Sequence, residues 1–285
     1  MEDTMTFKPA AVPFLRWVGG KRKFVPALAP QIKNYLEDTE GHYVEPFVGG
    51  GAMMFGLGIE RMVINDVLPD LTRLYTALRD TPVELGLLLC ELRDWGSEED
   101  NYYAVRASEP DTDVEAAARM VYLNAHCFNG LWRTNKAGEM NAAYGKKKDR
   151  ITDELIERIG TASEAIQGVE IFNGDFEPVV KAAVDGDLLY VDPPYDGTYV
   201  GYGPDGFTGV SQDRLGSELA DAHRRGVAFI AHNSDTEKVR SWYSYATLVP
   251  AGESSAVNRD GGGRGKAPCL LITNRPGLLK GHLTT

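Results

Sequence analysis

One stretch between residues 42 and 66 constrains the fold of this chain more than any other. It combines a short strand, a turn of three glycines, the start of a helix and a second strand that ends at an acid. Glycines after a strand allow a ligand to approach the backbone, and the following helix points its first amide groups into the same space. In order, the expected pieces are a strand at 42–45, the turn Gly49-Gly50-Gly51, a helix at 52–57 and a strand at 61–64.

The acid at the end of the second strand decides how this turn is interpreted. Three glycines alone are typical of any tight turn, and their spacing is not the G-x-G-x-x-G pattern of dinucleotide enzymes. Asp66, however, follows the second strand, where an acid can accept hydrogen bonds from ribose hydroxyls. The combination therefore favours a ligand that carries a nucleoside.

A second constellation, Asp192-Pro193-Pro194-Tyr195, follows an apolar strand expected at 187–191. Ligands of α/β sheets bind beyond the carboxyl ends of the strands. The two prolines fix the backbone and remove two amide donors, which leaves carbonyl groups without local partners. Asp192 and the Pro193 carbonyl can then accept hydrogen bonds from an exocyclic amine while Tyr195 stacks on the ring. A proline-stiffened loop that binds nothing is the plainer alternative.

Helix and strand patterns alternate on both sides of a long helical stretch. Apolar spacing is helical from about residue 69 to 126, whereas residues 127–150 show no period. We therefore expect an α/β protein whose sheet domain comprises 1–68 and 160–285, with an inserted helical part at 69–159. Further strands are expected at 169–173, 187–191, 227–231 and 268–273, and helices at 21–36, 153–166, 176–184, 212–225 and 235–242.

The net charge of −11 argues against a generally basic nucleic-acid binder, but one segment reverses the sign. Residues 125–150 carry six basic side chains and two acids, a local charge of +4. The segment also contains Phe128, Trp132 and several asparagines; aromatics can stack on bases, and asparagine or arginine can read base edges. We interpret it as a nucleic-acid surface rather than a solvated loop. Two shorter basic segments, 17–23 and 259–266, are either ordinary surface loops or contacts to an anionic ligand.

Several classes of site and location are excluded by simple features. The three cysteines (Cys90, Cys127 and Cys269) are far apart and form no C-x-x-C pair, so we expect neither a zinc site nor a disulfide framework. No run approaches the ~18 apolar residues of a membrane span. The N-terminus lacks the pattern of a signal peptide. The protein is therefore expected to be cytoplasmic, without a metal and without a membrane partner.

Taken together, these segments resemble the Dam-type (D12 class) site-specific DNA adenine-N6 methyltransferases. The resemblance covers most of the chain and keeps one order throughout. The combination of Glu-Pro-Phe-Val-Gly-Gly-Gly-Ala with Phe-Asn-Gly-Leu is more specific than Asp-Pro-Pro-Tyr alone. The segments that carry the resemblance are 14–21, 43–52, 65–71, 122–124, 128–135, 174–176 and 192–195.

The resemblance implies S-adenosyl-L-methionine as the cofactor, bound on a seven-stranded Rossmann-like methyltransferase sheet. It makes Asp192, Pro193, Pro194 and Tyr195 the catalytic residues that hold a flipped adenine. It also makes the helical insertion the target-recognition domain. The positions that match the cofactor pocket of the family are Trp17, Gly20, Lys21, Glu45, Pro46, Phe47, Gly49, Gly51, Asp66, Asp175, Phe176 and Asp192.

The family typically methylates GATC in double-stranded DNA, which implies the same site or a relaxed form of it here. One departure concerns the outer base: where the family usually has Phe-Asn-Val-Pro-Phe-Gly, residues 140–145 place Ala143 at the proline. On DNA, the enzyme is expected to be a monomer or a weak dimer. The predicted DNA contacts are Arg16, Asn124, Phe128, Asn129, Leu131, Arg133, Asn141, Lys146, Arg264 and Lys266.

Three alternatives stay open at this point. The amino group could belong to cytosine N4 or to RNA adenine, although Asp rather than Ser before Pro-Pro-Tyr favours adenine by family habit. A catalytically silent nucleic-acid binder that merely holds the cofactor is disfavoured by the intact Asp66 and Asp192. A nucleotide-binding oxidoreductase is disfavoured because the G-x-G-x-x-G pattern is missing.

Overall fold

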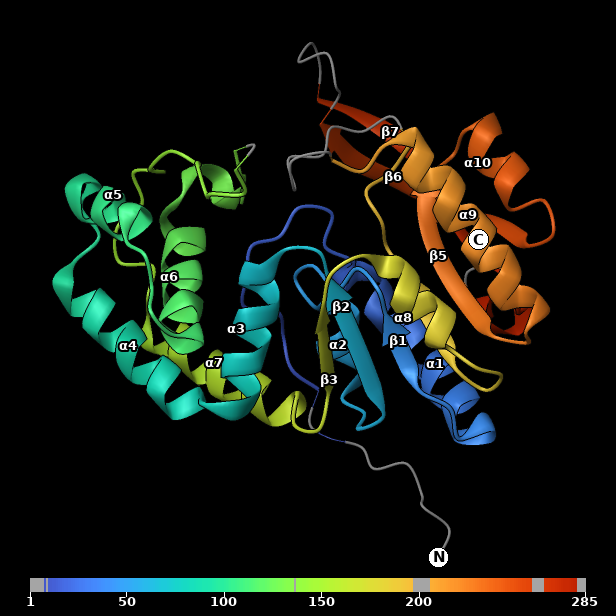
Figure 1. The fold of residues 1–285 in the computed structure, drawn as a ribbon, viewed down its shortest axis with the longest axis horizontal. Helices are drawn as coiled ribbons and strands as arrows, with labels where there is room; N and C mark the ends of the chain where they lie inside the picture. Colours follow the sequence, from blue (N-terminus) through green and yellow to red (C-terminus); the bar gives the residue numbers. More distant parts are fainter. Residues whose placement is uncertain (1–7, 9, 136, 197–205, 258–263, 281–285) are drawn as a thin grey trace, which may run out of the picture.

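The computed structural model describes residues 8, 10–135, 137–196, 206–257 and 264–280, the segments 253–257 and 264–267 by their backbone only. A seven-stranded sheet forms one part of the molecule, and a lobe of helices lies beside it (Figure 1). This architecture confirms the expected α/β class. In chain order the strands are β1 (Tyr43–Glu45), β2 (Met62–Asp66), β3 (Glu170–Asn173), β4 (Leu188–Val191), β5 (Ala228–Ser234), β6 (Thr247–Val257) and β7 (Arg264–Thr273).

The sheet is mostly parallel and reverses its direction of growth at its centre. The spatial order is β3-β2-β1-β4-β5-β7-β6, in which β3, β2, β1, β4 and β5 are parallel and β7 pairs antiparallel to both of its neighbours. The strands β2 and β3 lie on the outer side of β1, and β5, β7 and β6 lie on the outer side of β4. The boundary between β1 and β4 is therefore the topological switch point, where α/β sheets bind ligands.

Both faces of the sheet are covered, which explains why every residue of β1, β4 and β5 is buried. Successive side chains of a strand point to opposite faces. On β4, Leu188 and Tyr190 join the core shared with α1 and α2, whereas Leu189 and Val191 join the core under α8, α9 and α10. The covering helices are α1 (Val25–Thr39), α2 (Ala52–Leu57), α8 (Phe176–Ala182), α9 (Gly209–Arg224) and α10 (Glu237–Trp242).

The helical lobe is continuous with the first of these cores, because α3 packs against both α6 and β3. Prolines occupy the first turns of α3 and α4, where a missing amide hydrogen costs nothing. Thr112 and Glu115 form a capping box at the start of α6. The helices of the lobe are α3 (Pro69–Asp80), α4 (Pro82–Trp95), α5 (Glu99–Ala107), α6 (Asp113–His126) and α7 (Asp153–Ala165).

Three differences from the sequence-based expectation concern the site and the domain organisation. The helix expected at 21–36 begins as a short 3-10 turn (Arg22–Phe24) and becomes α1 only at Val25, so Lys21 precedes it. No strand was expected at β6, whose sequence mixes polar and apolar residues without a clean alternation. The proposed boundary at 159/160 falls inside α7, which packs against α3 and α4. We therefore propose that the helical part extends to Ala165.

Candidate active site

The loops that follow β1, β2 and β4 meet at one edge of the sheet, because these three strands are parallel neighbours. The first loop carries 46–51, the second begins at Asp66, and the third carries 192–195. The sequence motifs predict the ligand-binding glycine turn and the amine-binding residues in these loops. The sheet topology brings the three loops together around the switch point between β1 and β4.

The glycine turn is shaped by Trp17. Gly49 and Gly51 have positive φ values of 48° and 68°, a conformation that favours glycine. A Cβ atom on Gly49 would lie 2.9 Å from Nε1 of Trp17, and one on Gly50 would lie 2.7 Å from its Cβ. The indole therefore rests directly on the turn, and side chains larger than hydrogen would displace it.

Asp66 fixes the same turn from the other side. Its Oδ2 accepts the backbone amide of Gly49 at 2.9 Å, and its Oδ1 accepts that of Leu68 at 3.0 Å. Burial raises the pKa of Asp66 to about 6 despite these hydrogen bonds. The hydroxyl of Tyr75 donates to the Gly49 carbonyl at 2.6 Å. The backbone amide of Val67 also donates to the Asp66 carboxyl, which leaves about one of its four lone-pair sites for a ligand hydroxyl.

Asn65 joins two loops that lie far apart in the sequence. Its buried Nδ2 donates to the carbonyls of Pro46 and Gly174, both at 3.0 Å. The loop after β1 is thereby held next to the loop that leads into α8. From the sequence, Asn65 belongs only to the segment 65–71, because nothing local indicates a bond to a residue more than a hundred positions away.

An aromatic cluster forms one wall next to this junction. The ring centroids of Phe47 and Phe176 are 5.3 Å apart, and Phe207 lies 5.6 Å from the first and 6.0 Å from the second. The guanidinium of Arg214 lies 4.7 Å from the centre of the Phe176 ring and also pairs with Asp175. Phe207 lies in the loop before α9, and Arg214 lies in the first half of α9. The sequence motifs predicted neither residue.

Asp192 and Lys21 form a largely buried ion pair at the end of β4. Lys21 Nζ lies 2.7 Å from Oδ2 of Asp192, and their side chains are 9% and 20% exposed. The same ammonium lies 5.1 Å from the centre of the Tyr195 ring and donates to the Gly19 carbonyl. Burial raises the pKa of Asp192, and the charge of Lys21 opposes that rise.

The second oxygen of this carboxylate is left without a partner. Oδ1 of Asp192 is buried and has no hydrogen-bond partner within the described part of the chain, whereas a hydrogen bond between the Tyr195 hydroxyl and the carboxyl lowers the pKa of Asp192. A buried acceptor without a donor costs about 1–3 kcal/mol. The site therefore presents a fixed acceptor beside an aromatic ring, which suits a planar ligand with an N–H donor.

Glu45, one of the predicted cofactor contacts, is buried at the end of β1. It is 3% exposed and accepts the hydroxyl of Tyr43 at 2.8 Å. Burial raises its pKa well above the usual range, and the negative charge of Asp192 adds to the rise. The Glu45 side chain is thus buried near Asp192. The carbonyl of the next residue, Pro46, accepts a hydrogen bond from Asn65. Gly20 shows only an ordinary contact, since a Cβ atom there would lie 3.5 Å from the Trp17 carbonyl.

The basic segment after α6 folds into an irregular hairpin. Asn141 donates its backbone amide to Arg133 at 3.0 Å, and Asn135 donates to Glu139 at 2.9 Å. Phe128 has 58% of its surface exposed, an unusual amount for a phenylalanine. Of the predicted DNA contacts in this segment, Leu131 is half-buried, and the exposed residues are Phe128, Asn129, Arg133, Asn141 and Lys146.

The hairpin is anchored through backbone groups rather than through side chains at its tip. The carbonyl of Ala142 accepts the hydroxyl of Tyr102 at 2.9 Å and Nη1 of Arg106 at 3.0 Å. The carbonyl of Ala143 accepts the backbone amide of Phe128 at 2.8 Å. The position where the family proline is missing is therefore tied to the exposed phenylalanine.

Arg16 and Asn124 form a reciprocal pair. The backbone amide of Arg16 donates to Oδ1 of Asn124 at 2.9 Å, and Nδ2 of Asn124 donates back to the Arg16 carbonyl at 3.0 Å. Asn124 is 2% exposed. A Cβ atom on Gly130 would lie 2.8 Å from Cβ of Arg16. The structure thus places Asn124 where it holds the Arg16 backbone, and its contact with DNA stays a prediction.

The β6–β7 hairpin extends past the carboxyl edge of the sheet. Ser234, the last residue of β5, pairs with Cys269, so the part of β7 that begins at Arg264 lies beyond β5 and pairs only with β6. This extension and the loop after α6 lie at the same end of the molecule, uppermost in Figure 1. The side chains of Arg264 and Lys266 lie outside the described set.

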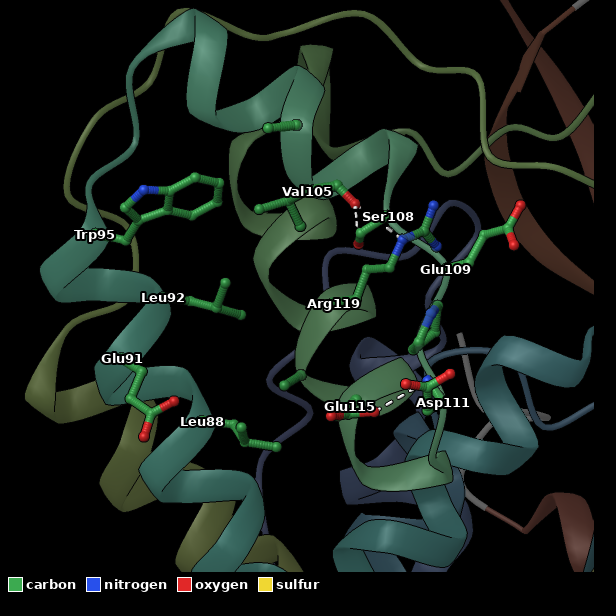
Figure 2. A pocket seen from close by; sticks show the side chains of 13 residues that line it. Leu88, Glu91, Leu92, Trp95, Val105, Ser108, Glu109, Asp111, Glu115 and Arg119 are labelled. Atoms are coloured by element: carbon green, nitrogen blue, oxygen red, sulfur yellow. Dashed lines mark hydrogen bonds between the residues drawn. The ribbon is translucent and has the colours of Figure 1, made fainter.

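A separate cavity of about 460 Å³ lies in the helical lobe between α4, α5 and α6 (Figure 2). Leu88, Leu92 and Trp95 line one side, and Glu109 and Arg119 line the other. None of its lining residues belongs to the loops at the switch point. Within the described residues, no group of three or more histidine, cysteine or acidic side chains could hold a metal, and no helix is long and apolar enough to cross a bilayer.

Comparisons with known proteins agree with this geometry. Residues 17–256 match the model of the D12 class N6 adenine-specific DNA methyltransferases. A type II methyltransferase, M1.LlaDCHI of Lactococcus lactis subsp. cremoris, is 34% identical over 92% of this chain and 95% of its own length. The DNA N-6-adenine-methyltransferase of Escherichia phage P1 is 35% identical over 93% of this chain but only 36% of its own length. The DNA adenine methylase of Escherichia coli K12 is 28% identical over 93% of this chain and 96% of its own.

Proposed function

Because this chain belongs to the D12 class N6 adenine-specific DNA methyltransferases, we propose that it takes the methyl group from S-adenosyl-L-methionine and acts on an adenine flipped out of the duplex. We further propose that the site is GATC or a relaxed form of it. The observation that carries the proposal is the buried acceptor Oδ1 of Asp192 beside Tyr195, at the switch point of the sheet.

The residues around the glycine turn fit the proposed cofactor. A nucleoside can lie along the turn because glycines leave its backbone open, and Asp66 can accept hydrogen bonds from a ribose hydroxyl. Trp17 and the Phe47–Phe176 pair supply apolar surface on either side. When bound, S-adenosyl-L-methionine supplies an electrophilic methyl group on a sulfonium, so no strong base is needed.

Asp192 and the Pro193 carbonyl then prepare the amine. The lone pair of the adenine amine is delocalised into the ring, which makes the nitrogen a poor nucleophile. Two accepted N–H bonds would favour a pyramidal nitrogen whose lone pair is free to form the new N–C bond. The methyl C–S bond of the sulfonium would break at the same time, its electron pair would stay on the sulfur as a neutral thioether, and the amine would lose one proton toward Asp192. Positioning and fixed dipoles supply most of the rate.

The exposed side chains of the hairpin suit contact with a DNA duplex from which one base has been flipped out. Removing a base from the stack costs a few kcal/mol, and an apolar wedge such as Phe128 can fill the space that the base leaves. Arg133 and Asn141 are exposed on the same hairpin and can reach base edges. Asn124, which is buried, would act by holding Arg16 in place.

Methyl transfer from labelled S-adenosyl-L-methionine to short duplexes tests the proposal. One duplex carries GATC, and the others change each position in turn. Transfer to adenine in GATC alone supports the strict site, whereas transfer to outer-base variants as well supports a relaxed site at the 140–145 loop. Label in cytosine, label only in RNA, or bound cofactor without any transfer would contradict it.

A further inference from the structure

Two buried amide side chains, one from α9 and one from β5, form hydrogen bonds with the backbone of the catalytic loop, residues 192–196. Gln212 on α9 donates from Nε2 to the carbonyl oxygen of Pro194 at 2.7 Å. Asn233, near the end of β5, donates from Nδ2 to Oε1 of Gln212 at 3.0 Å. The Oδ1 of Asn233 accepts the backbone amide of Asp196, also at 3.0 Å. Gln212 and Asn233 are only 2% and 1% exposed.

These bonds form a closed ring around Tyr195. The Asp196 amide donates to Asn233, Asn233 donates to Gln212, and Gln212 donates to the Pro194 carbonyl. The backbone from Pro194 through Tyr195 to Asp196 closes the ring. Hydrogen bonds in such a chain polarise and strengthen one another. The backbone on both sides of the Tyr195 ring is therefore fixed by two other elements of the fold.

The sequence of the loop explains why outside support is needed. Pro193 and Pro194 have no amide hydrogen, so the loop has few backbone donors with which to form a turn of its own. A buried carbonyl must still find a donor, and Gln212 supplies it to Pro194. The rigidity of the loop thus depends on side chains from α9 and β5.

We propose that Gln212 and Asn233 are positioning residues for methyl transfer. They touch neither adenine nor cofactor; they set the place of the Tyr195 ring and, through the Pro194 peptide, of the Pro193 carbonyl. The inference rests on the proposed function, because it assigns the loop to the amine. Reactions that depend on aligned groups are sensitive to small shifts, and a misplacement of 1 Å can cost about a hundredfold in rate.

The first test is Gln212→Met, which keeps the length of the side chain and removes both its donor and its acceptor. We expect the single-turnover rate at saturating DNA and cofactor to fall by about 10- to 100-fold. The cofactor dissociation constant should stay within about twofold, because the substitution impairs the alignment of the reacting groups in the transition state and not the binding of the cofactor in the ground state. A Gln212→Met rate within about twofold of wild type would overturn the proposal.

The second test, Gln212→Glu, separates positioning from general destabilisation. At high pH the carboxylate cannot donate to the Pro194 carbonyl, but its protonated form can donate one hydrogen bond and still accept from Asn233. The rate of this variant relative to wild type should therefore rise as the pH falls. A ratio that is flat with pH would count against the ring.

Thr273→Val is the matched control. Thr273 is fully buried and donates to the Phe229 carbonyl at 2.6 Å, but it pairs with Ile230 in the first half of β5, away from the loop. It should lower the melting temperature without changing the single-turnover rate of the folded enzyme. Equal loss of rate per folded molecule in this control and in Gln212→Met would refute a specific role.

Hydrogen exchange gives a readout that does not depend on methyl transfer. The amide of Asp196 donates within the ring, so its protection should fall in Gln212→Met and stay unchanged in Thr273→Val. Unchanged protection in Gln212→Met would overturn the proposal even if the enzyme were slow. Conversely, lost protection in a protein that methylates no adenine would support the ring and refute the proposed function.

Discussion

Lys21→Met is the perturbation that tests the electrostatics of the site most directly. The wild-type ammonium lies 2.7 Å from Asp192, and its positive charge opposes the rise in pKa that burial causes in that carboxyl. Methionine keeps a chain of similar length but carries no charge. Without the charge, the pKa of Asp192 must rise, and the ionised form that accepts the amine hydrogen becomes scarcer at low pH.

The separation of the charges sets the size of the effect. Two unit charges 2.7 Å apart interact by about 6 kcal/mol at an effective dielectric constant of about 20, equivalent to about 4 pKa units at 1.36 kcal/mol per unit. That value is a ceiling, because the Asp192 side chain is 20% exposed and water replaces part of the lost interaction. Nearby opposite charges usually shift a carboxyl by about 1–3 units, which is the shift we expect.

The assay is the pH profile of kcat/KM on a GATC duplex. The acidic limb should move to higher pH by about 1–3 units in Lys21→Met and by much less in Lys21→Arg, which keeps the charge. Burial raises the pKa of Asp66 to about 6, so that group could also set the limb; Lys21 contacts Asp192, and the shift therefore identifies the group. An unmoved limb with a rate loss that is the same at every pH would refute the reasoning and make Lys21 a ligand contact.

Three further changes test the remaining parts of the site. Asp192→Ala should abolish transfer of labelled methyl groups while equilibrium binding of the cofactor is largely kept; turnover near wild type would exclude Asp192 as the amine acceptor. Gly50→Ala puts a Cβ atom 2.7 Å from Cβ of Trp17, so cofactor affinity, measured by quenching of tryptophan fluorescence, should fall with little change in melting temperature. Arg133→Ala should relax sequence choice among the duplexes more than it lowers the rate on the best one; equal loss on all sequences would make Arg133 a phosphate contact.

Short motifs predicted the parts of the site that depend on local chemistry. The triple glycine predicted an open turn, and two of its residues do have positive φ. The order of strand, turn, helix and acid placed Asp66 beside that turn, where it accepts the Gly49 amide. Local spacing could not place Lys21, because the helix was expected to begin there and instead begins after it.

Contacts between distant segments could not be read from the sequence. Asn65, Gln212 and Asn233 are ordinary polar residues in their local context, and their roles appear only when strands bring separate loops together. Asn124 shows the same limit, because its place in a motif predicted a DNA contact, and its two hydrogen bonds to the Arg16 backbone appear only in the folded structure.

The sequence by itself thus determined the class of the fold, the order of its elements and the chemical types gathered at the strand ends, because helix and strand periods and proline or glycine geometry are local properties. Only the tertiary structure decided which carboxylate oxygen of Asp192 pairs with Lys21 and which has no partner among the described residues. It also decided that two amides from α9 and β5 support the loop at 192–196. Burial and pairing are properties of surroundings, and those surroundings exist only after the chain has folded.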